Sequence, residues 1–102
     1  MKKWKTITSD SATHEPLAMC LHLGQRCHIN LARDKNNDEK RIEATFVLSI
    51  DDGVKLEKTF RKKSQKPLNI EAKWAEDQAW NCLLEIADEV RRAQEMLVPD
   101  NK

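Results

Sequence analysis

Residues 41–61, RIEATFVLSIDDGVKLEKTFR, decide the fold of this chain. Apolar side chains occupy every second position of residues 41–50, and the alternation returns in residues 54–61. A period of two is typical of a strand with one buried face. The intervening Asp51-Asp52-Gly53 has the composition of a three-residue hairpin loop, with glycine where a positive φ is needed. The stretch therefore predicts an antiparallel β-hairpin.

A three-residue loop also fixes which side chains face each other across this hairpin. The register has three apolar pairs on the inner face and two favourable pairs on the outer face. These pairs are Ile50 with Val54, Leu48 with Leu56, Ala44 with Phe60, Glu43 with Arg61, and Thr45 with Thr59. Opposite charges and paired threonines across two strands are stabilising. Both faces therefore support the same register.

Two shorter alternating runs precede the hairpin, in residues 17–23 and residues 27–33. Both runs predict strands. The first run is also compatible with a short helix, because Thr13 could cap it and Gly24 could end it. Residues 34–40 are rich in asparagine and charge, which predicts an exposed connection. The favoured order of elements is ββββα, and the alternative is αβββα.

From residue 69 to about residue 97 the apolar period becomes that of a helix, with one stripe that would pack on the sheet. Its members are Ala72, Ala75, Ala79, Cys82, Leu83, Ile86, Val90, Ala93 and Leu97. At 1.5 Å per residue such a helix is ~40 Å long. A small sheet is narrower than that. We therefore expect part of the helix to overhang the sheet or to meet a partner.

These elements predict an α+β fold, in which an antiparallel β-meander of three to four strands packs on one long C-terminal helix. The sheet is expected in residues 17–61 and the helix in residues 69–97. Residues 1–16 are polar and precede this single domain, residues 17–102, with a short edge strand at most. Of the 102 residues, 39% are apolar and 34% charged. That composition fits a sheet and a helix that each keep one face in water.

The composition also argues against several classes of protein. The longest apolar runs are too short to span a membrane. The basic start, residues 1–5, is followed by polar residues where a signal peptide needs its apolar stretch. Three cysteines are too few for a disulfide scaffold. We therefore expect a cytoplasmic protein, and the net charge of +1 says little about its partners.

Cys20, His22, Cys27 and His28 are candidate zinc ligands, because thiols and imidazoles bind zinc. A three-residue loop at residues 24–26, however, points Cys27 into the core and the other three side chains outward. Turning Cys27 outward needs a one-residue slip, which would expose the apolar face of its strand. An open sheet face also lacks the cleft that activates a cysteine nucleophile. We predict no metal, no cofactor and no catalytic site, so the chain is not expected to be an enzyme.

Arg61, Lys62, Lys63 and Lys66 form a basic cluster between the last strand and the predicted start of the helix. Positive charge beside the free N–H groups of a helix start suits a phosphate. A solvated linker would have the same composition. The predicted outer sheet face carries no aromatic side chain on which single-stranded bases would stack. As an alternative function, the cluster therefore indicates binding to a duplex or RNA backbone.

Trp80 and Leu84 lie together with Ala87 on a second flank of the predicted helix, a quarter-turn or more from the centre of the stripe. Trp74 adds apolar surface near the helix start. Tryptophan is enriched at the centre of protein interfaces. The other interpretation is that the sheet curls and covers this flank. The favoured function is a small non-catalytic binding or regulatory module, whose helix contacts a partner protein or a second copy in a homodimer.

Overall fold

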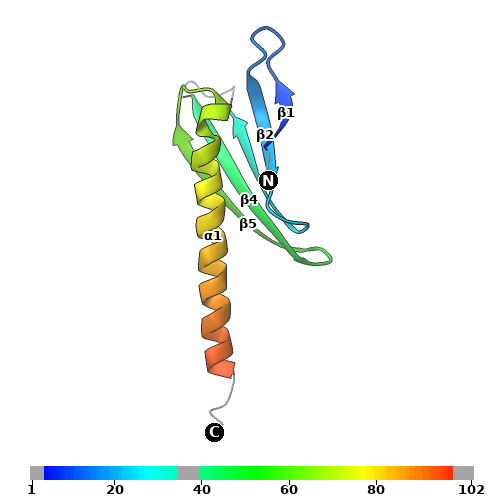
Figure 1. Ribbon diagram of the computed structural model, residues 1–102, viewed down its shortest axis with the longest axis vertical. Helices are drawn as coiled ribbons and strands as arrows, with labels where there is room; N and C mark the ends of the chain where they lie inside the picture. Colours follow the sequence, from blue (N-terminus) through cyan, green and yellow to red (C-terminus); the bar gives the residue numbers. More distant parts are fainter. Residues whose placement is uncertain (1–3, 35–39, 98–102) are drawn as a thin grey trace.

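A computed structural model describes residues 4–34 and 40–97 of the chain. The elements are β1 (Lys5–Ser9), β2 (Pro16–His22), β3 (Cys27–Arg33), β4 (Arg41–Asp51), β5 (Val54–Lys63) and α1 (Leu68–Leu97). The strands form one antiparallel sheet in the order β1-β2-β3-β4-β5. Helix α1 packs on one face of this sheet, against β2, β3 and β4 (Figure 1). The predicted α+β meander with one long helix is confirmed, but it has five strands.

The additional strand, β1, lies in the segment for which we expected a short edge strand at most. Lys5 faces Cys20 and Thr6 faces Met19 of β2, and the register shifts further along the pair. All five β1 side chains are exposed, so no apolar alternation marks the strand in the sequence. Backbone pairing with β2 and the packing of Trp4 against the core hold it in place.

The segment that was compatible with either a strand or a helix is strand β2. Its Leu21 faces Ile29 of β3, and the Leu23 backbone N–H donates a hydrogen bond to the Cys27 carbonyl at 2.8 Å. This is the register of a three-residue loop at residues 24–26. It keeps the apolar side chains of β2 and β3 on the same face, as the sequence predicts.

The β4–β5 hairpin has four of the five predicted pairs, and differs at its tip. The observed pairs are Leu48 with Leu56, Ala44 with Phe60, Glu43 with Arg61, and Thr45 with Thr59. At the tip, Asp51 takes the place of Ile50 opposite Val54, so the turn is Asp52-Gly53, with a φ of 76° at Gly53. Ile50 is therefore an extra residue in β4, a β-bulge that restores the register beyond it.

The core lies between the sheet and the first part of α1. Its largest fully buried side chains are Phe46, Leu21, Ile29, Leu31, Ile42 and Leu68. From α1, the small residues Ala75, Ala79 and Cys82 are buried against them. Because these side chains are short, the helix backbone lies close to the sheet along this part.

The apolar stripe of α1 continues beyond the part that the sheet covers. Leu83 and Ile86 are partly buried, whereas Val90 is 52% exposed and Ala93 is exposed. A helix of 30 residues is ~45 Å long, and its last turns project past the sheet (Figure 1). The expected overhang is confirmed, and Val90 and Ala93 lie outside the core. The side chain of Leu97 is outside the described part of the structure.

Candidate functional site

The flank of α1 formed by Trp80 and Leu84 is exposed in the structure. Trp80 is 38% exposed and Leu84 68% exposed, although both are large apolar side chains. The Trp80 Nε1–H donates a hydrogen bond to Glu76 Oε2 at 3.3 Å, one helical turn earlier. This bond orients the indole along the helix. The sheet does not cover this flank.

Trp74, the third residue expected at a contact, lies elsewhere on the helix. Trp80 is the sixth residue after Trp74, which places the two about 120° apart around the helix axis. Its ring is partly buried against the core, and the Lys62 ammonium lies 4.7 Å from the ring centroid. The structure therefore brings Trp80 and Leu84 together on one surface and places Trp74 on another.

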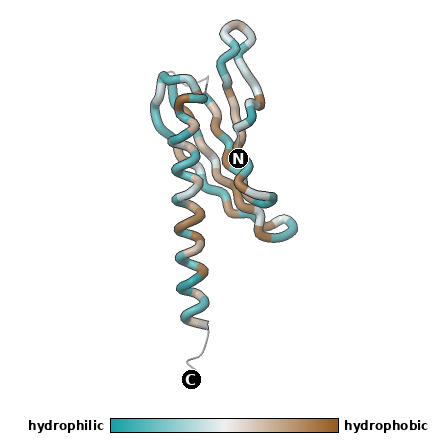
Figure 2. Tube along the Cα trace, in the orientation of Figure 1, coloured by the Kyte–Doolittle hydropathy of each residue, from teal (hydrophilic) through white to brown (hydrophobic). Residues whose placement is uncertain are grey.

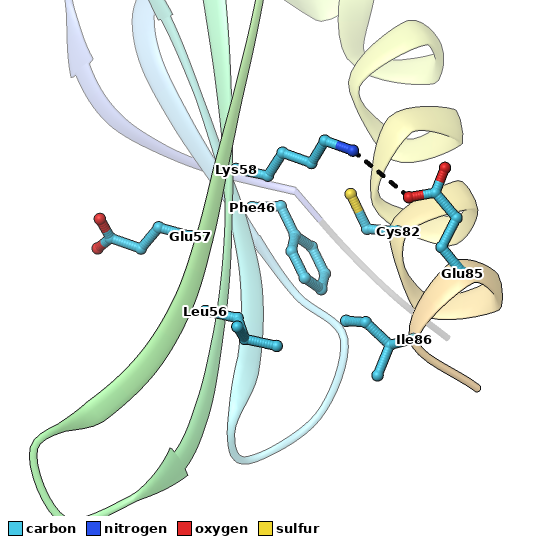
Figure 3. A pocket seen from close by; sticks show the side chains of 7 residues that line it. All are labelled: Phe46, Leu56, Glu57, Lys58, Cys82, Glu85 and Ile86. Carbon is cyan, nitrogen blue, oxygen red and sulfur yellow. Dashed lines mark hydrogen bonds and ion pairs between the residues drawn. The ribbon is translucent and has the colours of Figure 1, made fainter. Parts of the chain in front are cut away.

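An apolar groove opens where α1 and the β4–β5 hairpin diverge. It is lined by Phe46, Leu56, Glu57, Lys58, Cys82, Glu85 and Ile86. Figure 3 shows Leu56 and Ile86 on opposite walls with Phe46 between them. An ion pair of 3.4 Å between Lys58 Nζ and Glu85 Oε1 crosses from β5 to α1 at one side.

The groove continues into further exposed apolar surface on both walls. Leu56 is 43% exposed, and Ile50 and Val54 at the hairpin tip are also exposed. Figure 2 shows hydrophobic positions on α1 past the level at which the sheet ends. We expected these hairpin residues to face a covered core. The length of the predicted helix was the one signal in the sequence that the sheet would not cover it fully.

Members of the basic cluster form ion pairs with neighbouring acidic side chains. Arg61 Nε lies 2.9 Å from Glu43 Oε1, and Lys62 Nζ lies 2.8 Å from Glu71 Oε1. Lys63 and Lys66 are exposed. Arg61 and Lys62 therefore already pair with carboxylates, which weakens the cluster as an anion site.

Glu71 is a buried acid that the sequence pattern did not single out. It is 7% exposed, and it accepts a short hydrogen bond from the Ser64 hydroxyl as well as the contact with Lys62. Burial by itself would raise its pKa. The hydrogen bonds from Lys62 and Ser64, with the charges of Lys62 and Lys66, nevertheless hold the pKa of Glu71 below its ordinary value. This carboxylate ties the end of β5 to the first turn of α1.

The thiols and imidazoles considered as zinc ligands are divided between the two faces of the sheet. Cys27 is buried in the core, whereas His22 is exposed and pairs across the strands with His28, the ring centroids being 5.5 Å apart. Among the described residues, no group of three or more cysteine, histidine or acidic side chains could hold a metal ion. Burial raises the pKa of the Cys20 and Cys27 thiols, the opposite of what a nucleophile needs.

We predict that the fold does not depend on a metal ion. The melting temperature of the purified chain should be the same before and after treatment with a strong chelator, because Cys27 faces away from Cys20 and His22. Metal analysis of the same sample would accompany the melts, and His22→Ala would serve as a control with an unchanged chelator response. One equivalent of zinc, together with a large loss of stability on chelation, would contradict the placement of Cys27.

Within residues 4–34 and 40–97, no helix is long and apolar enough to cross a membrane. Compared with known protein families, with curated proteins and with solved structures, the chain matches none.

Proposed function

We propose that this chain is a small, non-catalytic binding module that contacts another protein chain through α1. The observation that carries the proposal is the exposed pair Trp80 and Leu84 on a helix that is itself anchored in the core. Large apolar side chains that lie together on an exposed surface often mark a site of interaction with another protein. A rigid helix also presents such anchors with little loss of conformational freedom on binding.

The chemistry of the other candidate groups favours this proposal over the alternatives. Raised thiol pKa values at Cys20, Cys27 and Cys82 disfavour thiolate catalysis. For nucleic acid, the ion pairs of Arg61 and Lys62 with Glu43 and Glu71 reduce the charge that the basic cluster offers to phosphates. A contact through the apolar side chains of Trp80 and Leu84 does not depend on such charge.

The double variant Trp80→Ser/Leu84→Ser tests the proposed contact. We expect it to remain folded, because neither side chain belongs to the core cluster. We expect it to weaken binding by roughly 30-fold or more, since an interface anchor of this kind is typically worth ~2 kcal/mol or more. Circular dichroism and thermal melts would report the fold. The complexes that the intact chain forms in its native cell, recovered under mild conditions, would report the contact.

The matched control is Asn81→Ser/Glu89→Ser, which changes two exposed positions elsewhere around α1. It should keep both the fold and the complexes. If Trp80→Ser/Leu84→Ser unfolds the chain, the flank belongs to the core and the proposal fails. If the variant folds and its complexes are those of the unchanged chain, the contact does not use this flank.

A further inference from the structure

Strand β5 forms one edge of the sheet. Within residues 4–34 and 40–97, β4 is the only strand that pairs with it, and the main contacts of α1 are with β2, β3 and β4. Eight of the ten side chains of β5 are exposed. An open edge presents a row of backbone N–H and C=O groups that can pair with an extended segment of another chain.

The hydrogen-bond pattern shows which backbone groups of β5 point to the open edge. The Ser64 N–H donates to the Lys40 carbonyl at 2.9 Å, one position beyond the last pair of the β4–β5 ladder. Bonded and non-bonded pairs alternate along an antiparallel ladder, so the even-numbered residues of β5 bond to β4. On its other side, β4 uses odd-numbered residues, since the Asp34 N–H donates to the Arg41 carbonyl. The backbone groups that point to the open edge therefore belong to residues 55, 57, 59 and 61.

Strand β5 is also a regular template, unlike the strand at the opposite edge. Its pairing with β4 has no irregularity from Lys55 to Lys63, and it contains neither proline nor glycine. Strand β1, at the other edge, has five residues and two register shifts. Short length and bulges hinder pairing with another chain at a sheet edge. The geometry therefore favours β5 as the edge that can be extended.

The inner side of this edge is apolar. Leu56 is 43% exposed and Phe60 is partly buried, both on the face of β5 toward α1. Helix α1 crosses β5 where Glu85 pairs with Lys58, and it continues on the side away from β4 (Figure 1). There Val90, on the stripe that continues from the core, is 52% exposed. A strand added beside β5 would lie beneath this part of α1, so its inward side chains would be apolar.

The outer side chains of β5 set the charges that an added strand should carry. Lys55 faces Ser49 of β4 and Glu57 faces Val47, so neither has an oppositely charged neighbour across that pair of strands. An acidic residue opposite Lys55 and a basic residue opposite Glu57 would be stabilising. Five of the ten residues of β5 are lysine or arginine and one is glutamate. A second copy of β5 would therefore bring like charges together, which disfavours self-pairing.

We propose that β5 pairs with an extended segment of a different protein. The segment adds a sixth strand to the sheet, with apolar side chains toward α1 and charged side chains on the outer face. Antiparallel pairing is the expected orientation, because it is slightly more stable per residue than parallel pairing. This contact goes beyond the proposed function and uses another surface. Trp80 lies about 160° around the helix axis from the buried Cys82, on the side of α1 away from the sheet.

Hydrogen exchange of single amides, measured by NMR on the isotope-labelled full chain, tests the pairing. The probe is a synthetic peptide with capped ends, Thr-Val-Thr-Val-Lys-Val-Glu, whose last residue is placed opposite Lys55 in antiparallel register. The amides of residues 55, 57, 59 and 61 should exchange quickly in the free chain and slowly with the peptide bound. The amides of residues 56, 58, 60 and 62 should exchange slowly in both states, because they already bond to β4.

Two N-methylated versions of this peptide form a matched pair with the same side chains. Methyl groups on the N–H groups of the second threonine and the lysine block the bonds to Thr59 and Glu57. They should weaken binding by roughly 10-fold or more, the effect of losing two hydrogen bonds. Methyl groups on the first two valines point away from β5 and should leave binding unchanged.

The variant Glu57→Pro tests the edge from the side of the protein. It removes an N–H that points outward, and proline is accepted on an edge strand in that orientation. The chain should therefore stay folded by circular dichroism and no longer protect its edge amides when the peptide is added. Glu57→Ala is the control and should keep both the fold and the protection.

The outcomes separate this inference from the proposed function. Equal binding of the two methylated peptides overturns the sixth strand, and so do edge amides that stay unprotected at millimolar peptide. Trp80→Ser/Leu84→Ser should bind the peptide as the unchanged chain does, because its substitutions lie on the other side of α1. A failure at β5 therefore leaves the flank contact to be decided by its own variant.

Discussion

Phe46→Ala is expected to lower the free energy of unfolding by about 3–5 kcal/mol, the usual loss when a buried phenylalanine is truncated. Phe46 is 1% exposed and is the largest of the fully buried side chains. It fills the space between β4 and the middle of α1, where Cys82 and Ile86 approach it. Small domains have a total free energy of unfolding of roughly 5–15 kcal/mol. Each 1 kcal/mol lost lowers the melting temperature by ~4–8 °C, so this variant should melt well over 10 °C lower.

The matched control is Leu56→Ala, which changes a neighbour in the same groove. Leu56 is far more exposed, so the expected loss is ~1 kcal/mol or less. Urea titrations at micromolar protein would measure both variants on the single chain. If the two variants lose the same free energy of unfolding, the groove is closed in solution. That result would contradict the divergence of the hairpin and α1.

The strand register of the hairpin could be predicted from the sequence because the side chains on each of its two faces specify that register independently. The inner pairs Leu48–Leu56 and Ala44–Phe60 and the outer pair Glu43–Arg61 all require the same register. A one-residue slip would have reversed every side chain. The tip is different: a three-residue loop and a two-residue turn with a bulge at Ile50 give the same pairing further along. The pattern therefore could not distinguish them.

Strand β1 was expected as a short edge strand at most, and the burial of Glu71 was not predicted, for different physical reasons. The side chains of β1 are exposed, so backbone pairing supports the strand and no periodicity reports it. Glu71 looked like an ordinary acid in the first turn of a helix, where it suits the helix dipole. Only the packing of α1 against the end of β5 shows that it is buried beside Lys62 and Ser64.

The candidate contact surface could be predicted in part. The positions of Trp80 and Leu84 off the core stripe follow from helical spacing alone. The groove could not be predicted, because it depends on the angle between α1 and the hairpin. Ala75, Ala79 and Cys82 pack the first half of the helix against the sheet, and the angle is a property of the packed elements together.

Lys62→Met should lower the free energy of unfolding at pH 7 by about 1–3 kcal/mol, the loss expected when a buried polar group loses its partner. In the folded chain, Glu71 is buried and bound by Lys62 and Ser64, and its pKa lies below the ordinary value of 4.5. A depressed pKa contributes stability that is present above the unfolded value and is lost as the pH falls through the folded value. Without Lys62, its hydrogen bond and charge no longer lower the pKa of Glu71 while burial still raises it, so the pKa rises and this contribution to stability shrinks.

The deficit of Lys62→Met relative to the unchanged chain should therefore be largest at neutral pH and shrink as the pH falls below about 4.5. Urea midpoints between pH 7 and pH 3 would measure it, with Lys55→Met, at an exposed position of the same strand, as the control that loses ~0.5 kcal/mol or less. The Lys62 side chain also lies over the Trp74 ring, which gives a second explanation for any loss. That contact does not titrate with Glu71, so a deficit that is constant across the whole pH range would assign the stabilisation to Trp74 and contradict the role of the carboxylate.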